Sequence, residues 1–245
     1  MFVKETPWET RNLGVKSSAE FYFESTDTVE TLTEEVLRNT TYAYQVAHIP
    51  AGKIDILNAL LNTGFYFAET KILMSADLNT YTLPEKFKVA MSGLKYHEAN
   101  ATELELIYKK MREGMFDTDK VALDPHFNAQ VAGNRYALWT QDEIAAGRCS
   151  PFITTYEDEV IGFFMLKKTD NKTGDSFLGG VFDKNNNIGF GFAIIYLIMY
   201  EAKKLGLKKI VTGVSSNNLD SVRVHIALGY QVKTLLYTLV KHLEK

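Results

Sequence analysis

The chain has 245 residues, of which 46% are hydrophobic and 23% charged, and its formal net charge at pH 7 is -3. This length predicts one or two globular domains, and the charge balance argues against a protein that binds nucleic acid or anionic membranes through bulk positive charge. The single cysteine, Cys149, excludes a disulfide framework and a cysteine-based zinc site, and we expect it to be an inert thiol.

The histidines stand at positions 48, 97, 126, 225 and 242, and none of them has the i, i+4 spacing typical of paired metal ligands. The sequence alone therefore predicts no metal site. The first residues lack the apolar segment of a secretory signal, and the longest apolar stretch, 190–200, is about half as long as a membrane span. We expect a cytoplasmic protein.

The first ninety residues predict a small α/β domain. Alternation of apolar and polar residues, together with β-branched and aromatic runs, indicates strands, and amphipathic stretches indicate helices. Strands are predicted over 17–24, 42–49 and 65–76, and helices after Asp27 and over 55–63. The polar segment 79–88 is typical of a linker, so we place two domains at 1–90 and 91–245.

The second domain begins with helical patterns and then changes to strands. Thr102 and Glu105 have the spacing of a capping box at the start of a helix, and a second helix is predicted over 128–146. From Ser150 the hydrophobic period changes toward two, which indicates an antiparallel hairpin followed by a third strand. Strands are predicted over 152–156, 160–167, 176–182, 209–214 and 230–239, and helices over 190–205 and 220–228.

Two short segments of the chain resemble each other. Residues 60–65 and 225–230 each end a short helix on glycine followed by an aromatic residue, and a strand follows in both cases. The similarity predicts that the N-terminal domain is a partial repeat of the larger one. The alternative is chance, because glycine ends many helices.

A glycine-containing loop joins a predicted strand to a predicted helix at 186–192. The first amides of a helix lack intrahelical partners and lie at the positive end of its dipole, and glycine lets an anion approach the backbone. The loop lacks the third glycine of the dinucleotide fingerprint and the Gly-Lys-Ser/Thr of a P-loop. The predicted anion-binding residues are Asn186, Asn187, Ile188, Gly189, Phe190, Gly191 and Phe192; the alternative is a tight turn.

The order of these elements, together with two motif spacings, resembles the GNAT superfamily of N-acetyltransferases. The family's pyrophosphate loop, Arg/Gln-Gly-x-Gly-x-Gly/Ala, falls on 186–191, and its later motif, Asn-x-x-Ala-x-x-x-Tyr-x-x-x-Gly-Phe, falls on 218–230. The resemblance implies an α/β (α+β) fold with a central mixed, mostly antiparallel sheet flanked by helices, and acetyl-CoA as the cofactor. Asn186 and Asn187 replace the usual Arg/Gln and Gly, so we expect weaker but retained cofactor binding.

The resemblance also implies roles for residues near the cofactor. The pantetheine arm would lie between strands 176–182 and 209–214, with backbone amides at Val181 and Phe182 near the thioester. Asn218 and Ser221 would lie beside the cofactor, although Asn218 could instead be a helix cap.

His225 occupies the position of the tyrosine that family members commonly use as the general acid. An imidazole can give a proton to the departing thiolate, and its pKa is better matched to neutral pH than that of a phenol. We therefore predict that His225 is the general acid. The alternative is a half-buried helix residue without a catalytic role.

Polar and aromatic residues over 116–139 are candidates for the acceptor side. A carboxylate in this segment could take the proton of the amine, and a cation could hold a phosphate. The predicted acceptor-binding residues are Asp117, Asp119, Lys120, Arg135 and Trp139. The alternatives are a solvated loop for the aspartates and a core position for the aromatic residues.

Three further segments, 7–15, 62–65 and 135–139, resemble family members that acetylate the amino group of a nucleotide-linked deoxysugar. The resemblance implies an N-acetyltransferase for such an amine. Another small amine as the acceptor, or a non-catalytic module that binds acetyl-CoA, are the alternatives. We expect a small-molecule amine as the binding partner, without nucleic acid or membrane, and leave homodimer formation open.

Overall fold

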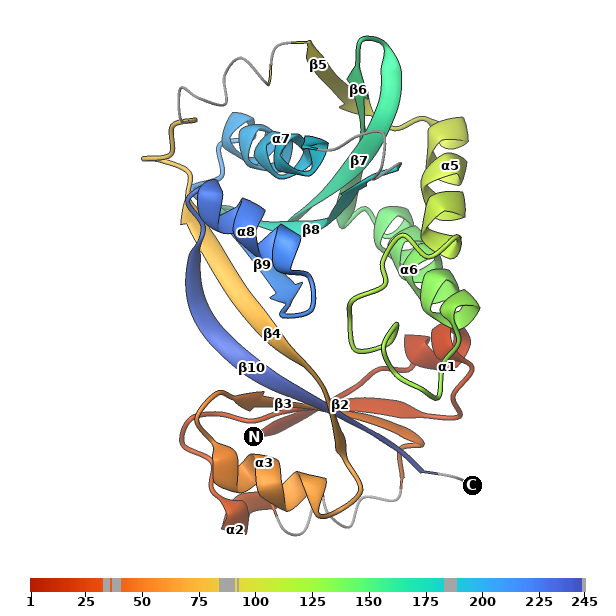
Figure 1. Ribbon diagram of the computed structural model, residues 1–245, viewed down its shortest axis with the longest axis vertical. Helices are drawn as coiled ribbons and strands as arrows, with labels where there is room; N and C mark the ends of the chain where they lie inside the picture. Colours follow the sequence, from red (N-terminus) through yellow and green to blue (C-terminus); the bar gives the residue numbers. More distant parts are fainter. Residues whose placement is uncertain (33–35, 37–40, 84–90, 92, 183–188, 244–245) are drawn as a thin grey trace.

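The structure, a computed structural model, describes residues 1–243 except 33–35, 37–40, 84–90, 92 and 183–188. In this part of the chain ten strands form one sheet in the order β1-β2-β3-β10-β4-β9-β8-β7-β6-β5 (Figure 1). The β2–β3 and β8–β9 pairs are parallel, and the other neighbouring pairs are antiparallel. The sheet is therefore mixed and mostly antiparallel, with helices on its faces, as the resemblance implied.

The element bounds agree with most of the predicted elements to within a few residues. The strands are β1 Phe2–Glu5, β2 Ser18–Tyr22, β3 Tyr44–Pro50, β4 Tyr66–Asp77, β5 Leu94–Glu98, β6 Cys149–Tyr156, β7 Glu159–Lys168, β8 Thr173–Val181, β9 Lys209–Ser215 and β10 Gln231–His242. The helices are α1 Trp8–Leu13, α2 Val29–Leu32, α3 Ile54–Leu61, α5 Ala101–Arg112, α6 Ala129–Ala145, α7 Phe190–Lys204 and α8 Leu219–Ala227. None of these described helices is long and apolar enough to cross a membrane.

The predicted start of α5 is wrong by two residues. Asn100 is the N-cap, its side chain accepts the Glu103 amide (3.1 Å), and the Glu103 carboxylate accepts the Asn100 amide (2.9 Å). Asparagine caps a helix as well as threonine does, so the same spacing occurs twice in this segment and the earlier one forms the capping box.

Two long strands, β4 and β10, join the two ends of the sheet (Figure 1). They pair with each other, while β4 also pairs with β9 and the C-terminal half of β10 pairs with β3. Because each strand pairs with a strand of the other part, Leu239 of β10 lies in the apolar core of the N-terminal part and Met74 of β4 lies in the core beneath α7. Each side chain is at most 2% exposed. The two predicted domains thus share one sheet, and residues 84–88 of the predicted linker lie outside the described residues.

The topology of the N-terminal part repeats that of the C-terminal part. Apart from α1, which lies between β1 and β2, the series β1-β2-α2-β3-α3-β4 has the same order and strand directions as β7-β8-α7-β9-α8-β10. The corresponding strands β3 and β9 have 7 residues each, and β4 and β10 have 12 each. The last strand of each series pairs beside the third strand of the other. This arrangement agrees with a partial repeat, although duplication of the sequence itself stays a prediction.

Candidate functional site

A cavity of about 750 Å³ lies where β8 and β9 diverge. In the described residues these strands pair only over 173–175 and 209–211. A β-bulge at Phe177 follows directly, as the register shift against β7 shows, and a bulge bends its strand. Its lining comes from β8, β9 and α8, from β4, which pairs with β9, and from β2, β3, α1 and α6.

The divergence leaves a backbone edge that can bind an extended ligand, and the geometry corrects one predicted contact. The Phe182 amide donates to the Ile161 carbonyl of β7 (2.9 Å), so it cannot polarise a thioester in the cavity. That bond makes Val181 and Gly162 a non-hydrogen-bonded pair, and the Val181 amide therefore points away from β7 toward the open edge. The predicted donor is thus displaced by one residue.

The N-terminus of α7 can hold an anionic group. Gly189 precedes this 15-residue helix with φ +94°, a conformation that favours glycine, and no atom lies within 4 Å of the position that a β-carbon on Gly191 would take. Phe190 packs against Tyr156, and the Phe192 amide donates to the Gly189 carbonyl (3.3 Å). Asn186, Asn187 and Ile188 lie outside the described residues. The described part of the predicted loop fits the pyrophosphate of a nucleotide cofactor.

Asn218 and Ser221 both line the cavity at the start of α8. Asn218 is the N-cap of this helix, because its side-chain oxygen accepts the Ser221 amide (3.1 Å). The side-chain oxygen of Asn218 therefore acts as a helix cap, which was the alternative to a role beside the cofactor. Its side-chain nitrogen is the group that can still face a ligand.

His225 lines the same cavity and is 2% exposed. Its Nδ1 donates to the Ser221 carbonyl (2.7 Å), and its ring packs edge-on against Tyr230 at 4.8 Å between centroids. Nε2 is buried without a hydrogen-bond partner in the described part of the chain. Burial lowers the pKa of His225, so at neutral pH the ring is neutral and Nε2 carries a lone pair.

Glu69 lines the cavity from β4, the strand next to β9, and sequence reasoning did not identify it. It is 5% exposed, lies beside Ser215 of β9, and its Oε2 has no hydrogen-bond partner among the described residues. Burial raises the pKa of this carboxyl. A buried carboxyl with an unpartnered oxygen in a cavity is a candidate catalytic group.

Lys71 is two residues further along β4 and so points to the same face as Glu69. Its side chain lies against Gly213 of β9, where an added β-carbon would come within 2.6 Å of Lys71 Cε. Burial lowers the pKa of Lys71, and burial raises that of Asp175 on β8, which also lines the cavity. Titratable groups with shifted pKa values therefore gather in the part of the lining that β4 and β8 contribute.

Lys120 lines the cavity, as predicted for the acceptor side, but its charge is already paired. Its Nζ donates to Glu20 of β2 (2.8 Å), which also accepts the Tyr22 hydroxyl and lies 3.7 Å from His48 Nε2. Burial alone would raise the pKa of Glu20, yet Lys120 and His48 hold it well below its usual range. Burial lowers the pKa of His48 to about 4.

Arg135 is paired in the same way. Its guanidinium donates to both carboxylate oxygens of Glu9 from α1, and both residues are buried. Removing one partner of a buried pair costs about 3–5 kcal/mol. Neither Arg135 nor Lys120 can therefore turn to a phosphate without leaving its partner, Glu9 or Glu20, unpaired. Their predicted contact with phosphate is therefore not supported by the geometry.

The remaining predicted acceptor residues divide between the cavity and its surroundings. Trp139 lines the cavity and packs edge-on against Phe177 (4.5 Å), and Asp119 lines it while accepting the Val121 and Ala122 amides. Asp117 is not among the described residues that line it. Cys149 is buried, and burial raises its pKa to about 12, which agrees with an inert thiol.

The comparison with protein families identifies the C-terminal part of the chain. The family described as the acetyltransferase (GNAT) domain matches residues 103–242, which is more than half of the chain. A search of curated proteins by sequence found no match.

Solved structures share the fold at low sequence identity. A GCN5-related N-acetyltransferase from Sphaerobacter thermophilus superposes on 81% of this chain with TM-score 0.55 and 16% identity, and this chain spans 59% of its length. A conserved protein of unknown function from Staphylococcus epidermidis superposes on 97% of this chain with TM-score 0.60 and 13% identity, and this chain spans 88% of its length. A glucosamine N-acetyltransferase region in a fungal multi-domain β-N-acetylglucosaminidase superposes on 92% with TM-score 0.61 and 15% identity, over 30% of that chain. These identities establish the GNAT fold alone.

Proposed function

We propose that this chain, which belongs to the acetyltransferase (GNAT) domain family, transfers an acetyl group from acetyl-CoA to a primary amine bound in the cavity between β4 and the β8–β9 edge. The observation that carries the proposal is the cavity itself. It brings together the part of β8 that is not paired with β9 in the described residues, suited to an extended cofactor, and the buried, unpartnered oxygen of Glu69.

The residues of the β8–β9 edge fit acetyl-CoA. The Val181 amide would meet the pantetheine end, the first turn of α7 from Gly189 would hold the pyrophosphate, and Asn218 and Ser221 would flank the arm. When bound, acetyl-CoA supplies a thioester whose carbonyl carbon is open to attack by an amine.

Glu69 is the residue to which we assign the proton of the amine. An amine enters as the ammonium ion and must lose a proton before it can attack. Because the pKa of Glu69 is raised, it lies closer to the pKa of an ammonium ion. Proton transfer from the ammonium to Glu69 is therefore less unfavourable. The nitrogen then bonds to the acetyl carbon, the carbon–sulfur bond breaks, one proton stays with Glu69 and one proton must reach the sulfur.

The general-acid role of His225 remains our proposal for that last proton. Only Nε2 can face the sulfur, because Nδ1 is bound to the Ser221 carbonyl. Nε2 carries a proton only in the imidazolium form, and the lowered pKa makes this form a minority at pH 7. The expected contribution of His225 is therefore largest below neutral pH.

The acceptor that we propose is an amino sugar carried on a nucleotide. The support is the resemblance of 7–15, 62–65 and 135–139 to TDP-fucosamine acetyltransferase, together with the similar fold of a region described as a glucosamine N-acetyltransferase. Trp8 and Trp139 line the cavity, and Lys4 lies over the Trp8 ring at 5.3 Å. We assign the nucleobase to Trp8 and a phosphate to Lys4, since Lys120 and Arg135 are already paired.

Replacement of Glu69 tests the base. Glu69→Gln keeps the shape and removes the proton acceptor, so we expect kcat to fall by about 10²- to 10⁴-fold with little change in acetyl-CoA affinity. A base works when deprotonated, so the wild-type rate should rise with pH through a pKa above 4.5, and this limb should be absent in the variant. Steady-state CoA release between pH 4.5 and 8 measures both.

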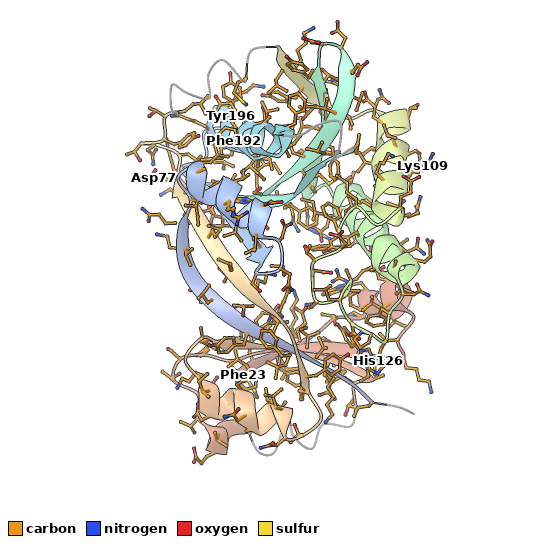
Figure 2. The ribbon with its side chains drawn as sticks, in the orientation of Figure 1. Phe23, Asp77, Lys109, His126, Phe192 and Tyr196 are labelled. Carbon is orange, nitrogen blue, oxygen red and sulfur yellow. The ribbon has the colours of Figure 1, made fainter. Side chains whose placement is uncertain are left out.

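The matched control for this experiment is Asp77→Asn, an exposed carboxylate at the far end of the same strand (Figure 2). It should leave the rate and the pH profile unchanged. Full turnover in Glu69→Gln, with the limb preserved, would assign the base to another group.

Replacement of His225 tests the acid. An acid works when protonated, so the wild-type kcat should fall as pH rises through a pKa below 6.5. In His225→Gln this limb should disappear while the affinity for acetyl-CoA, measured by titration calorimetry, changes little. His97→Gln, at an exposed histidine outside the cavity lining, is the control. Retention of the limb in His225→Gln contradicts the role.

A panel of amines tests the acceptor. We expect nucleotide-linked amino sugars to raise the melting temperature and to stimulate CoA release more than glucosamine, spermidine or free amino acids do. Trp8→Ala should weaken the response to nucleotide sugars and leave the response to glucosamine intact, because it removes only the stacking surface. If only spermidine stimulates CoA release, the chain is an acetyltransferase but the proposed acceptor is wrong. If none of the amines supports turnover, the proposed enzymatic activity is wrong.

A further inference from the structure

Away from the cavity, Asp124, His126 and His242 lie together although they come from distant parts of the chain. Asp124 and His126 belong to the segment between α5 and α6, and His242 ends β10. The ligand atoms of the three side chains all lie within 4.8 Å of one another. Figure 2 marks His126 beside the strands of the N-terminal part.

The carboxylate at the centre of this group is fully buried. The Asp124 side chain has no exposed surface, while those of His242 and His126 are 13% and 48% exposed. One oxygen of Asp124 is 2.8 Å from His242 Nε2, and the other is 3.2 Å from His126 Nδ1. A buried carboxylate facing two imidazole nitrogens, with one side open to solvent, is a donor set suited to a divalent cation.

The imidazole rings are arranged on one side of the carboxylate. They stack with 4.0 Å between centroids and 15° between planes. Neutral imidazole nitrogens and a carboxylate oxygen bind Zn²⁺ at about 2.0–2.2 Å, and the ligand atoms of a tetrahedral site lie a little over 3 Å apart. The two nitrogen–carboxylate distances are already near that separation, so a small movement of the side chains would bring the donors around one ion.

Tyr66 of β4 also holds the carboxylate. Its hydroxyl donates to Asp124 Oδ1 (2.6 Å) and lies 3.0 Å from His126 Nδ1, and the His126 backbone amide also donates to Asp124 (2.9 Å). Hydrogen bonds of this kind orient a ligating carboxylate and are a usual part of metal sites.

We propose that Asp124, His126 and His242 form a divalent-cation site with a preference for Zn²⁺, in which the three side chains bind the ion and water completes the coordination. The site is separate from the acetyl-transfer cavity and needs no part of the proposed function. Its ion would tie the segment that carries Asp119 and Lys120, which line the cavity, to the end of β10.

Zinc titration of the metal-free full-length chain tests the site. After dialysis against a chelator, we expect saturable binding of one Zn²⁺ per chain by calorimetry and a rise in melting temperature, with Co²⁺ giving the visible bands of a four-coordinate site. His126→Ala, at the most exposed ligand, should abolish this binding without unfolding the chain. Tyr66→Phe should weaken it by about 10- to 100-fold.

His97→Ala is the matched control, because His97 also contacts a carboxylate, Glu103 at 2.8 Å, without a third ligand near it in the described residues. It should bind Zn²⁺ as the wild type does. The proposal is overturned if the wild type shows no saturable Zn²⁺ binding, or if His126→Ala and His242→Ala, both folded by circular dichroism, bind Zn²⁺ as tightly as the wild type.

Discussion

The antiparallel pairing of β4 with β10 is the interaction on which the rest of the structure depends. Each of these 12-residue strands leaves its own half of the chain and pairs beside a strand of the other half. Leu239 and Met74 are thereby buried in cores built mainly from the other half of the chain. The free-energy cost of exposing these side chains to water opposes separation of the halves. The pairing also places Glu69 and Lys71 of β4 in the same cavity lining as the divergent strands β8 and β9, so the proposed base comes from outside the segment that matches the acetyltransferase family.

Within the described residues, the parallel strands diverge into a wedge in only one of the two similar halves. In the C-terminal half the parallel pairing stops at Asp175, and the bulge at Phe177 bends β8 away from β9. In the N-terminal half the equivalent strands β2 and β3 remain paired over five successive positions, 18–22 with 44–48. That half instead supplies charged groups, of which Glu9 and Glu20 neutralise Arg135 and Lys120 and so hold α6 and the 116–128 segment against it.

Local patterns were sufficient to predict most of the fold. Period-two and amphipathic segments predicted eight of the ten described strands and six of the seven described helices, and the motif spacings identified Asn218 and His225, which line one cavity. Partnership across the chain could not be predicted in this way. Arg135 has the chemistry of a phosphate ligand, but its guanidinium donates to Glu9 of α1, a contact that no local pattern indicates. In the same way, nothing near Glu69 in the sequence indicates that Ser215 and the cavity lie beside it. The same limit applies to Asp124, His126 and His242, whose only sequence signal is a two-residue spacing in a loop.

A crystal structure of the chain with coenzyme A would test the central claim most directly, namely that the cavity between the halves is one active site built from both. We expect the pantetheine arm along the open edge of β8, its sulfur facing Glu69 of β4, and the pyrophosphate at the first turn of α7. A sulfur on the opposite face of the sheet from Glu69, or coenzyme A bound outside the β8–β9 wedge, would contradict it.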